Sequence, residues 1–399
     1  MTKFLLISDI HACDEDPSNS DAPSYVSSVS PTSLGEPDPI GSLEKLLKGK
    51  PELRPDFILC AGDITNKAHP GSLTYAWSKL DILAQSVGAK LVATVGNHDI
   101  DSRYKENKFD PRGYVMSLKP EIPAPNRNSF LEYWAENFTI LSHPDLNLAV
   151  INTAAYHGGG KESAVEIEHG RISELTLAGI AKRLKSLPKA SVNILLCHHH
   201  PSKGDAGDKD IGGPTRGGER LIDLLGQDKS AWVVVHGHKH VPDLFYGQGG
   251  SNSPVILACA SFAAQVNADA QNKNPNQVHL LQCDPAHAKS AGLVSAGTVL
   301  TWTWQPGLGW SPAKAGQGLP HKTGFGFRGS PATLVKDLEI HLSKSGVAHM
   351  QWAEALKLIP SVQNLIPSDF DLFARHLEDA GMHMLHERSG EVAQIGIVP

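Results

Sequence analysis

The chain has 399 residues, which is enough for one large domain with an ample core and a small second domain. Its net charge of −6 provides no basic field, which argues against strong non-specific binding to nucleic acid. The N-terminal apolar run (residues 4–7) is too short for a signal-peptide core, and no run approaches the ~20 residues that span a bilayer. The five cysteines lack CxxC spacing, and most of them lie in or beside apolar runs, as buried reduced thiols do. We therefore expect a soluble, cytoplasmic protein.

The first 240 residues alternate strand-like and helix-like patterns. Short apolar, β-branched runs predict strands at 4–7, 57–60, 91–95, 148–153, 192–197 and 232–235. Amphipathic patterns between them predict helices at 42–48, 72–87, 175–187 and 219–225, with Gly88 ending the second helix. Two segments without periodicity, 13–41 and 101–130, predict irregular inserts, the first of them near the mouth of a site.

The pattern changes after residue 240. Runs at 255–260, 278–282 and 298–304 follow one another without helices, which predicts a second, mixed or antiparallel sheet packed on the first. Residues 306–330 are rich in Gly and Pro and predict a linker. Residues 331–399 predict a small, mostly helical, winged-helix-like module of three short helices and a hairpin. This module has five Lys and Arg against nine Asp and Glu, so we expect it to bind a protein partner or to regulate, rather than to read DNA.

Blocks of metal-ligand residues follow five of the strand-like runs. They are Asp9-Ile10-His11, Gly62-Asp63, Gly96-Asn97-His98-Asp99, His198-His199-His200-Pro201 and Gly237-His238-Lys239-His240. If the strands share one sheet, the blocks meet at the edge where open α/β sheets bind ligands. Taken singly, each block has a structural explanation, because Asp after a strand caps helices and Asn after Gly is a common turn residue. Their convergence favours a metal site.

Carboxylate, imidazole and amide side chains together form the ligand mixture that a pair of divalent ions requires. Two such ions ~3.5–4 Å apart activate a water molecule and place positive charge on phosphoryl oxygens, which is what hydrolysis of a phosphate ester needs. The sequence therefore favours a dinuclear hydrolytic centre.

The order DxH, GD, GNHD, H-x-P and GHxH resembles the calcineurin-like metallophosphoesterase superfamily, over about residues 1–305. The resemblance implies an α/β fold, a four-layer α/β/β/α sandwich, which holds two divalent metal ions (Mn, Fe or Zn) and cleaves phosphoesters through a metal-bound hydroxide. It implies that one ion is held by Asp9, His11, Asp63 and His240. It implies that the other is held by Asp63, Asn97, His199 and His238, with His198 as the alternative to His199.

The same resemblance implies roles for two residues that do not bind metal. His98 is implied to stabilise the phosphoryl oxyanion or to protonate the leaving oxygen. Asp99 is implied to orient the His98 imidazole and to raise its pKa.

The sequence leaves four functions open. The acidic charge favours a phosphodiesterase that acts on a nucleotide-type or other small phosphoester over a DNA or RNA nuclease of the same superfamily. A protein phosphatase is a weaker possibility within the superfamily. A metal-binding scaffold whose C-terminal module docks a partner is the non-enzymatic alternative, although the complete ligand set favours an active enzyme.

Overall fold

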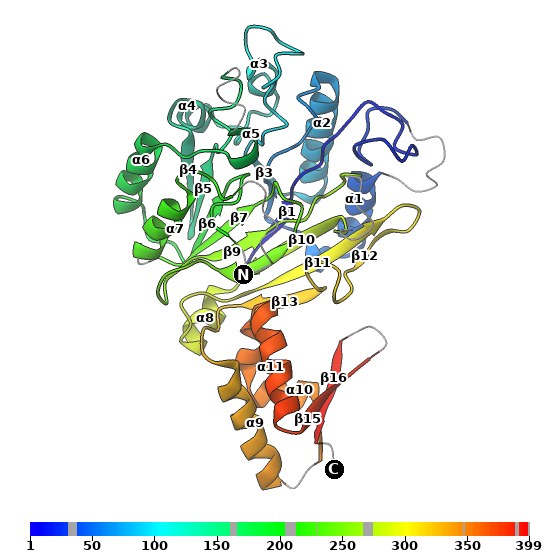
Figure 1. The fold of residues 1–399 in the computed structure, drawn as a ribbon, viewed down its shortest axis with the longest axis vertical. Coiled ribbons are helices and arrows are strands. Elements are labelled where there is room, and N and C mark those ends of the chain that lie inside the picture. The colour runs from blue at the N-terminus through cyan, green and yellow to red at the C-terminus, as the bar shows by residue number, and fades with distance from the viewer. Residues whose placement is uncertain are drawn as a thin grey trace.

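The fold is taken from a computed structural model of the chain, which describes residues 1–30, 38–159, 166–203, 213–228, 230–265, 274–345, 348–387 and 391–397. Its first 325 residues build two large sheets, and a smaller lobe follows them (Figure 1). Within the described ranges, no helix combines the length and the apolar character that a membrane span requires.

The first sheet has seven strands and mixes parallel and antiparallel pairs. Its strands are β1 (Thr2–Ile7), β2 (Phe57–Cys60), β3 (Lys90–Ala93), β10 (Gln277–Cys283), β11 (Gly297–Gln305), β12 (Gly309–Pro312) and β13 (Lys322–Phe325). The order is β12-β11-β10-β1-β2-β3, with β13 also paired to β11. Strands β1, β2 and β3 are parallel, so the loops that follow them leave the sheet at one edge.

The second sheet has six strands in the order β4-β5-β6-β7-β9-β8. They are β4 (Phe138–His143), β5 (Leu146–Ile151), β6 (Val192–Leu196), β7 (Trp232–His236), β8 (Asp243–Tyr246) and β9 (Val255–Ala258). The four central strands are parallel, and both edge strands are antiparallel to their neighbours.

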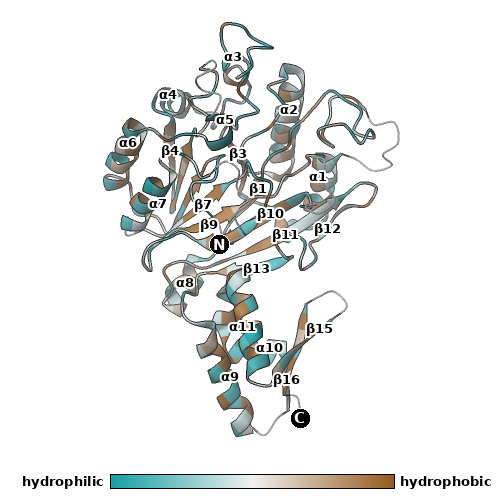
Figure 2. Cartoon of the chain, viewed as in Figure 1, coloured by the Kyte–Doolittle hydropathy of each residue, from teal (hydrophilic) through white to brown (hydrophobic). Residues whose placement is uncertain are grey.

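Helices pack around the two sheets (Figure 1). They are α1 (Pro39–Gly49), α2 (Pro70–Val87), α3 (Gly113–Met116), α4 (Arg127–Glu136), α5 (Glu166–His169), α6 (Glu174–Lys185), α7 (Gly218–Gln227) and α8 (Pro285–Ala291). Along β6, Ile194 and Leu196 point into the core between the sheets, whereas Leu195 packs against α6 and α7. Figure 2 shows this pattern as apolar strands inside and mixed-polarity helices outside. The predicted four-layer α/β/β/α fold is confirmed.

The distribution of strands between the two sheets differs from the sequence prediction. The metal-ligand blocks do not follow strands of one sheet, because three follow the first sheet and two follow the second. Of the late strands that were expected to form a sheet of their own, β9 joins the second sheet, whereas β10 and β11 extend the first. Apolar periodicity marks a strand but does not record which strand lies beside it, and this is why the prediction was wrong.

The segment predicted as a linker, 306–330, is partly folded into the first sheet. Strands β12 and β13 both pair with β11 in antiparallel register. They are four-residue strands that contain Gly or Pro, and such short strands at a sheet edge lack the β-branched run on which a strand prediction depends.

The C-terminal lobe has its own core of apolar side chains. It contains α9 (Pro331–Ser345), α10 (Trp352–Leu358), the 3₁₀ helix η3 (Pro360–Asn364), α11 (Pro367–Asp379) and a sheet of β14 (His349–Gln351), β16 (Val392–Ile397) and β15 (Met382–His386). The predicted hairpin is β15–β16, and its turn lies outside the described residues. Tyr246 of β8 ties this lobe to the second sheet, because its hydroxyl donates to the Phe327 carbonyl and accepts from the Gly326 amide.

Candidate metal centre

Loops from both sheets meet at one place. The loops after β1 and β2 run side by side, because the Asp9 and His11 amides donate to the Gly62 and Asp63 carbonyls. The loop after β7 crosses from the second sheet, and the amide of His238 donates to both carboxylate oxygens of Asp9 at 3.1 and 3.0 Å. Residues more than 200 positions apart in the chain therefore share one site.

The backbone at this site is strained. A positive φ is unfavourable for residues with a Cβ and costs roughly 1–2 kcal/mol each. Such strain concentrates where function requires a particular side-chain direction. Five of the predicted ligands have a positive φ, namely Asp9 (φ 52°), His11 (50°), Asp63 (52°), His238 (80°) and His240 (57°).

The glycines of the blocks let the chains approach one another. A Cβ on Gly62, which has φ +91°, would lie 2.6 Å from the Gly96 amide nitrogen. A Cβ on Gly96 would overlap the Asp63 carboxylate, and one on Gly237 would overlap the Ser8 hydroxyl and Asp9. Each glycine thus keeps a ligand-bearing loop in contact with the next loop.

The first group of donor atoms comes from Asp9, His11 and His240, whose candidate ligand atoms lie within 4.8 Å of one another. His240 Nε2 is 3.3 Å from Asp9 Oδ1 and 3.1 Å from His11 Nε2. Asp63 adjoins this group, since its Oδ2 is 3.7 Å from His11 Nε2.

The second group surrounds the Asn97 amide oxygen. His198 Nε2 lies 3.0 Å from Asn97 Oδ1 and 3.3 Å from Asp63 Oδ2, and His238 Nδ1 lies 3.1 Å from Asn97 Oδ1. The other nitrogen of each of these two rings binds a carbonyl, Ala61 O for His198 and Glu168 O for His238. Such bonds fix the tautomer and direct the remaining lone pair into the site. Asp63 Oδ2 is thus shared by the two groups.

The choice between His198 and His199 is informed by these contacts. His198 approaches both Asn97 and Asp63, whereas the Nδ1 of His199 lies 2.8 Å from the hydroxyl of Thr153. The contacts favour His198 as the ligand in the family pattern, and the sequence-based choice of His199 stays a prediction. Only His199 fits the H-x-P spacing to Pro201, so the contacts of His198 could not be read from this pattern.

The buried carboxylates of Asp9 and Asp63 favour positive charge between the two donor groups. Burial alone would raise the pKa of Asp9, yet His240 and His198 lower it below its usual range. Burial would lower the pKa of His198, but the Asp63 carboxylate raises it to about 9. Two buried carboxylates that stabilise a positive charge between them are the surroundings that a metal ion requires.

His98 is held by neighbours other than the predicted Asp99. Its Nδ1 lies 3.2 Å from Asn66 Oδ1, and the Lys67 amide approaches the same nitrogen at 3.3 Å. The carboxylate of Asp99 instead accepts hydrogen bonds from backbone amides, at Ile64 and Thr65 through Oδ1 and at Gly96 through Oδ2. The geometry therefore does not support Asp99 as the residue that orients His98, because this carboxylate ties the second and third loops together.

A cavity of about 430 Å³ opens beside the donor groups. Its lining includes four of the predicted ligand histidines and carboxylates, and also His98, Asn66 and Gln265. The N-terminal insert contributes Asp21 and Pro23 to its wall, and Gln265 Nε2 donates to the Pro17 carbonyl of that insert at 2.9 Å. The expectation that this insert lies near the site mouth is confirmed. Sequence patterns gave no signal for Asn66 and Gln265.

The donor set fits two metal ions. Two ligands of one ion, each at about 2.0–2.2 Å, lie roughly 3–4 Å apart. The closest contacts within the groups are 3.0, 3.1 and 3.3 Å, and one carboxylate oxygen lies near both groups. The mixture of imidazole, carboxylate and amide suits borderline divalent metals.

The family model of calcineurin-like phosphoesterases matches residues 2–242, which contain all five blocks. The chain belongs to this family. It is therefore a hydrolase that acts on phosphoesters, and its family depends on a pair of metal ions. A second model, the winged helix-turn-helix that is associated with calcineurin-like domains, matches residues 323–379 of the phosphoesterase.

Solved structures resemble the phosphoesterase at low sequence identity. A dimetal phosphatase from Danio rerio has 13% identity and a TM-score of 0.47, over 70% of this chain and 92% of that one. The NAD nucleotidase of Haemophilus influenzae has 14% identity and a TM-score of 0.34, over 82% of this chain and 56% of that one. A 5′-nucleotidase precursor from Thermus thermophilus has 11% identity and a TM-score of 0.36, over 82% and 54%. No curated protein matches the sequence.

Proposed function

We propose that the protein is a dinuclear-metal phosphodiesterase that acts on a small, nucleotide-type substrate. The observation that carries the proposal is the position of Asp63, whose Oδ2 lies 3.7 Å from His11 Nε2 and 3.3 Å from His198 Nε2. A carboxylate shared by two donor groups is what a two-metal hydrolytic centre requires.

We assign Asp9, His11, Asp63 and His240 to one ion, and Asp63, Asn97, His198 and His238 to the other. When bound, two such ions polarise the phosphoryl oxygens and lower the pKa of a nearby water molecule. The left-handed loops and the glycine contacts hold these ligands in place before substrate binds, which lowers the reorganisation required for reaction.

His98 is the residue that we assign to the leaving group or the phosphoryl oxygen. It lines the cavity next to Asp63, and the His98 amide donates to Asp63 Oδ1 at 2.7 Å. Since Asn66 and Lys67 engage Nδ1, Nε2 is the ring nitrogen available to a substrate.

The cavity supports a small substrate with a single negative charge. Its volume of about 430 Å³ is at the lower end of the range for small-molecule sites. Among the described residues, no Lys or Arg lines it, while the Asp21 carboxylate does. Exposed Arg103 contributes, after burial, to the lowered pKa of His98, but it does not line the cavity. A polyanionic nucleic acid would need more positive charge than this.

A substrate panel tests the proposal. With Mn²⁺ present, we expect bis-p-nitrophenyl phosphate and cyclic AMP to be hydrolysed with higher kcat/KM than p-nitrophenyl phosphate, and every activity to disappear with a chelator. Faster cleavage of single- or double-stranded DNA would identify a nuclease instead. Absence of all hydrolysis in a metal-loaded, folded protein would favour the scaffold.

We also propose that the lobe over 331–399 binds a protein partner or regulates the enzyme. Its composition of five Lys and Arg against nine Asp and Glu supports this proposal over DNA binding, which a winged helix would otherwise suggest. Binding of the full chain to duplex DNA with a steep dependence on salt would contradict it.

A further inference from the structure

The imidazole of His199 lies beside the second donor group but is not a member of it. Its side chain is fully buried, and its Nε2 has no hydrogen-bond partner among the described residues. A buried polar atom without a partner lowers stability, so native structures provide a partner for nearly all such atoms. The Nε2 atom of His199 therefore calls for a ligand.

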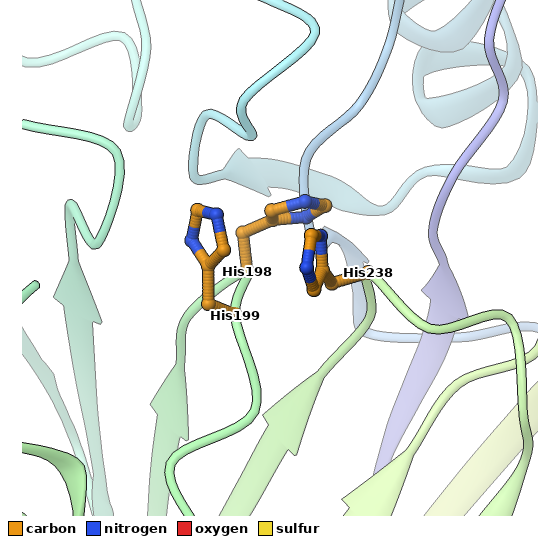
Figure 3. Close-up of side chains that lie close together, drawn as sticks. All are labelled: His198, His199 and His238. Carbon is orange, nitrogen blue, oxygen red and sulfur yellow. The ribbon is translucent and has the colours of Figure 1, made fainter. Parts of the chain in front are cut away.

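His199 belongs to a cluster with the two imidazoles of the second donor group. The candidate ligand atoms of His198, His199 and His238 all lie within 4.8 Å of one another. The ring of His199 is centred 4.8 Å from that of His198 and 4.5 Å from that of His238. Figure 3 shows the three rings gathered at the ends of adjacent strands of the second sheet.

The surroundings of His199 hold its ring in one orientation. The Thr153 hydroxyl oxygen accepts from the His199 amide at 3.2 Å and lies 2.8 Å from Nδ1. When Nδ1–H donates to this oxygen, Nε2 carries the lone pair that a metal needs. Gly170, with φ +64°, packs so closely that a Cβ there would lie 2.5 Å from Nδ1, and the ring therefore has little freedom to turn.

From these contacts we infer that His199 is an additional ligand of the second ion, beside Asp63, Asn97, His198 and His238. The inference rests on the proposed dinuclear function and deepens it. Three imidazoles on one ion favour Zn²⁺, Fe²⁺ or Co²⁺ over Mn²⁺ at that position, because imidazole suits the former and oxygen ligands suit the latter. The two metal positions then differ in their preference.

Co²⁺ binding to the full-length, chelator-treated protein tests the inference without an activity assay. We expect the wild-type chain to take up two Co²⁺ in equilibrium dialysis. In His199→Phe, we expect the second Co²⁺ to bind roughly 10–100-fold more weakly, by analogy with the loss of groups that support ligands. We also expect its visible bands to move to longer wavelength, because a water oxygen replaces an imidazole nitrogen.

Two further variants sharpen the test. Thr153→Val keeps His199 but removes the hydroxyl that sets its tautomer, and should weaken the second Co²⁺ by about 10-fold. His157→Gln is the matched control, because His157 is another buried imidazole, centred 5.3 Å from His199 but outside the three-histidine cluster. This control should bind Co²⁺ as the wild type does.

The outcomes separate the inference from the proposed function. Wild-type affinity and spectrum in both His199→Phe and Thr153→Val would overturn the inference and leave the dinuclear centre intact. Equal weakening in His157→Gln would reveal a general packing effect and would overturn it as well. A wild-type chain that binds no Co²⁺ would overturn the proposed function and the inference together. If His199→Phe does not fold, Thr153→Val decides.

Discussion

At the scale of single residues, two ligand side chains of the second donor group are oriented by hydrogen bonds that they make outside that group. His198 and His238 each hydrogen-bond a backbone carbonyl through one ring nitrogen, which leaves the other nitrogen free to bind a metal ion. Asp63 is shared between both donor groups, and Asn66 engages His98. Substitutions of adjacent residues in the site should therefore have different effects: some should lower metal binding, some should lower kcat and others should lower stability.

Asp63→Asn should remove the carboxylate charge shared by the two groups. We expect kcat/KM for bis-p-nitrophenyl phosphate to fall more than about 100-fold, since loss of groups that only support ligands costs 10–100-fold. Metal content should fall below two ions per chain. Asp81→Asn, on the outer helix α2, is the control for charge and should behave as the wild type. Unchanged turnover in Asp63→Asn would refute the shared site.

Asn66→Ala and Asp99→Asn should have different consequences. Loss of Asn66 leaves His98 poorly oriented, so kcat should fall by roughly 10-fold or more, most strongly for substrates with poor leaving groups. In Asp99→Asn, an NH₂ group replaces one of the two oxygens that accept hydrogen bonds from backbone amides. The loss of this acceptor should lower the free energy of unfolding by about 1–3 kcal/mol. Kinetics with a leaving-group series and urea unfolding measure the two effects. The reverse pattern would restore Asp99 as the residue that orients His98.

At the scale of elements, the loops after the strands determine the site more than the strands do. Three of the five ligand blocks leave their sheets through left-handed residues, and the glycines Gly62, Gly96 and Gly237 admit the neighbouring loops. The strands supply rigid starting points, and their side chains are almost entirely buried. A change in loop geometry should therefore affect both stability and metal binding.

Gly62→Ala should show this coupling. The new Cβ meets the Gly96 amide and stands on a backbone with φ +91°, so we expect a loss of at least about 1–2 kcal/mol together with weaker metal binding. Gly49→Ala is the control, because nothing lies within 4 Å of a Cβ at the end of α1. Urea midpoints and metal titration check both variants. Equal stability of the two would contradict the close-approach explanation.

At the scale of the whole molecule, two sheets from distant parts of the chain enclose many neutral imidazoles. Burial lowers the pKa of His279 and of His236 to about 3. In the unfolded chain these imidazoles gain a proton near pH 6.5, so the unfolded state binds more protons below that pH. Their contribution to stability is complete above pH 6.5 and is lost as the pH falls from 6.5 towards 3.

His279→Gln tests this dependence at a position away from the metal site. When the pH falls from 7 to 5, protonation of one such imidazole in the unfolded chain lowers the free energy of unfolding by about 2 kcal/mol. We therefore expect the variant to lose about 2 kcal/mol less than the wild type between these pH values, as measured by urea unfolding. The exposed His383, changed to Gln, is the control. Identical pH dependence in His279→Gln and the wild type would contradict the role of burial.

The sequence by itself determined the strands that precede the ligand blocks, the blocks themselves and the family. A buried strand and the Asp, Asn or His that follows it are local patterns, and spacing along the chain preserves their order. Helix α2 and its end at Gly88 were likewise predictable, since a left-handed glycine closes it at φ 73°.

Only the tertiary structure decided which strands are neighbours and which side chains meet. The division of the blocks between two sheets, the sharing of Asp63 and the pairing of Asn66 with His98 all join residues far apart in the chain. The approach of His198 to Asn97 and Asp63, and of His199 to Thr153, likewise joins residues that are far apart in the chain. The apolar periodicity of one segment does not indicate which other segments it contacts, because these contacts are determined by packing between segments.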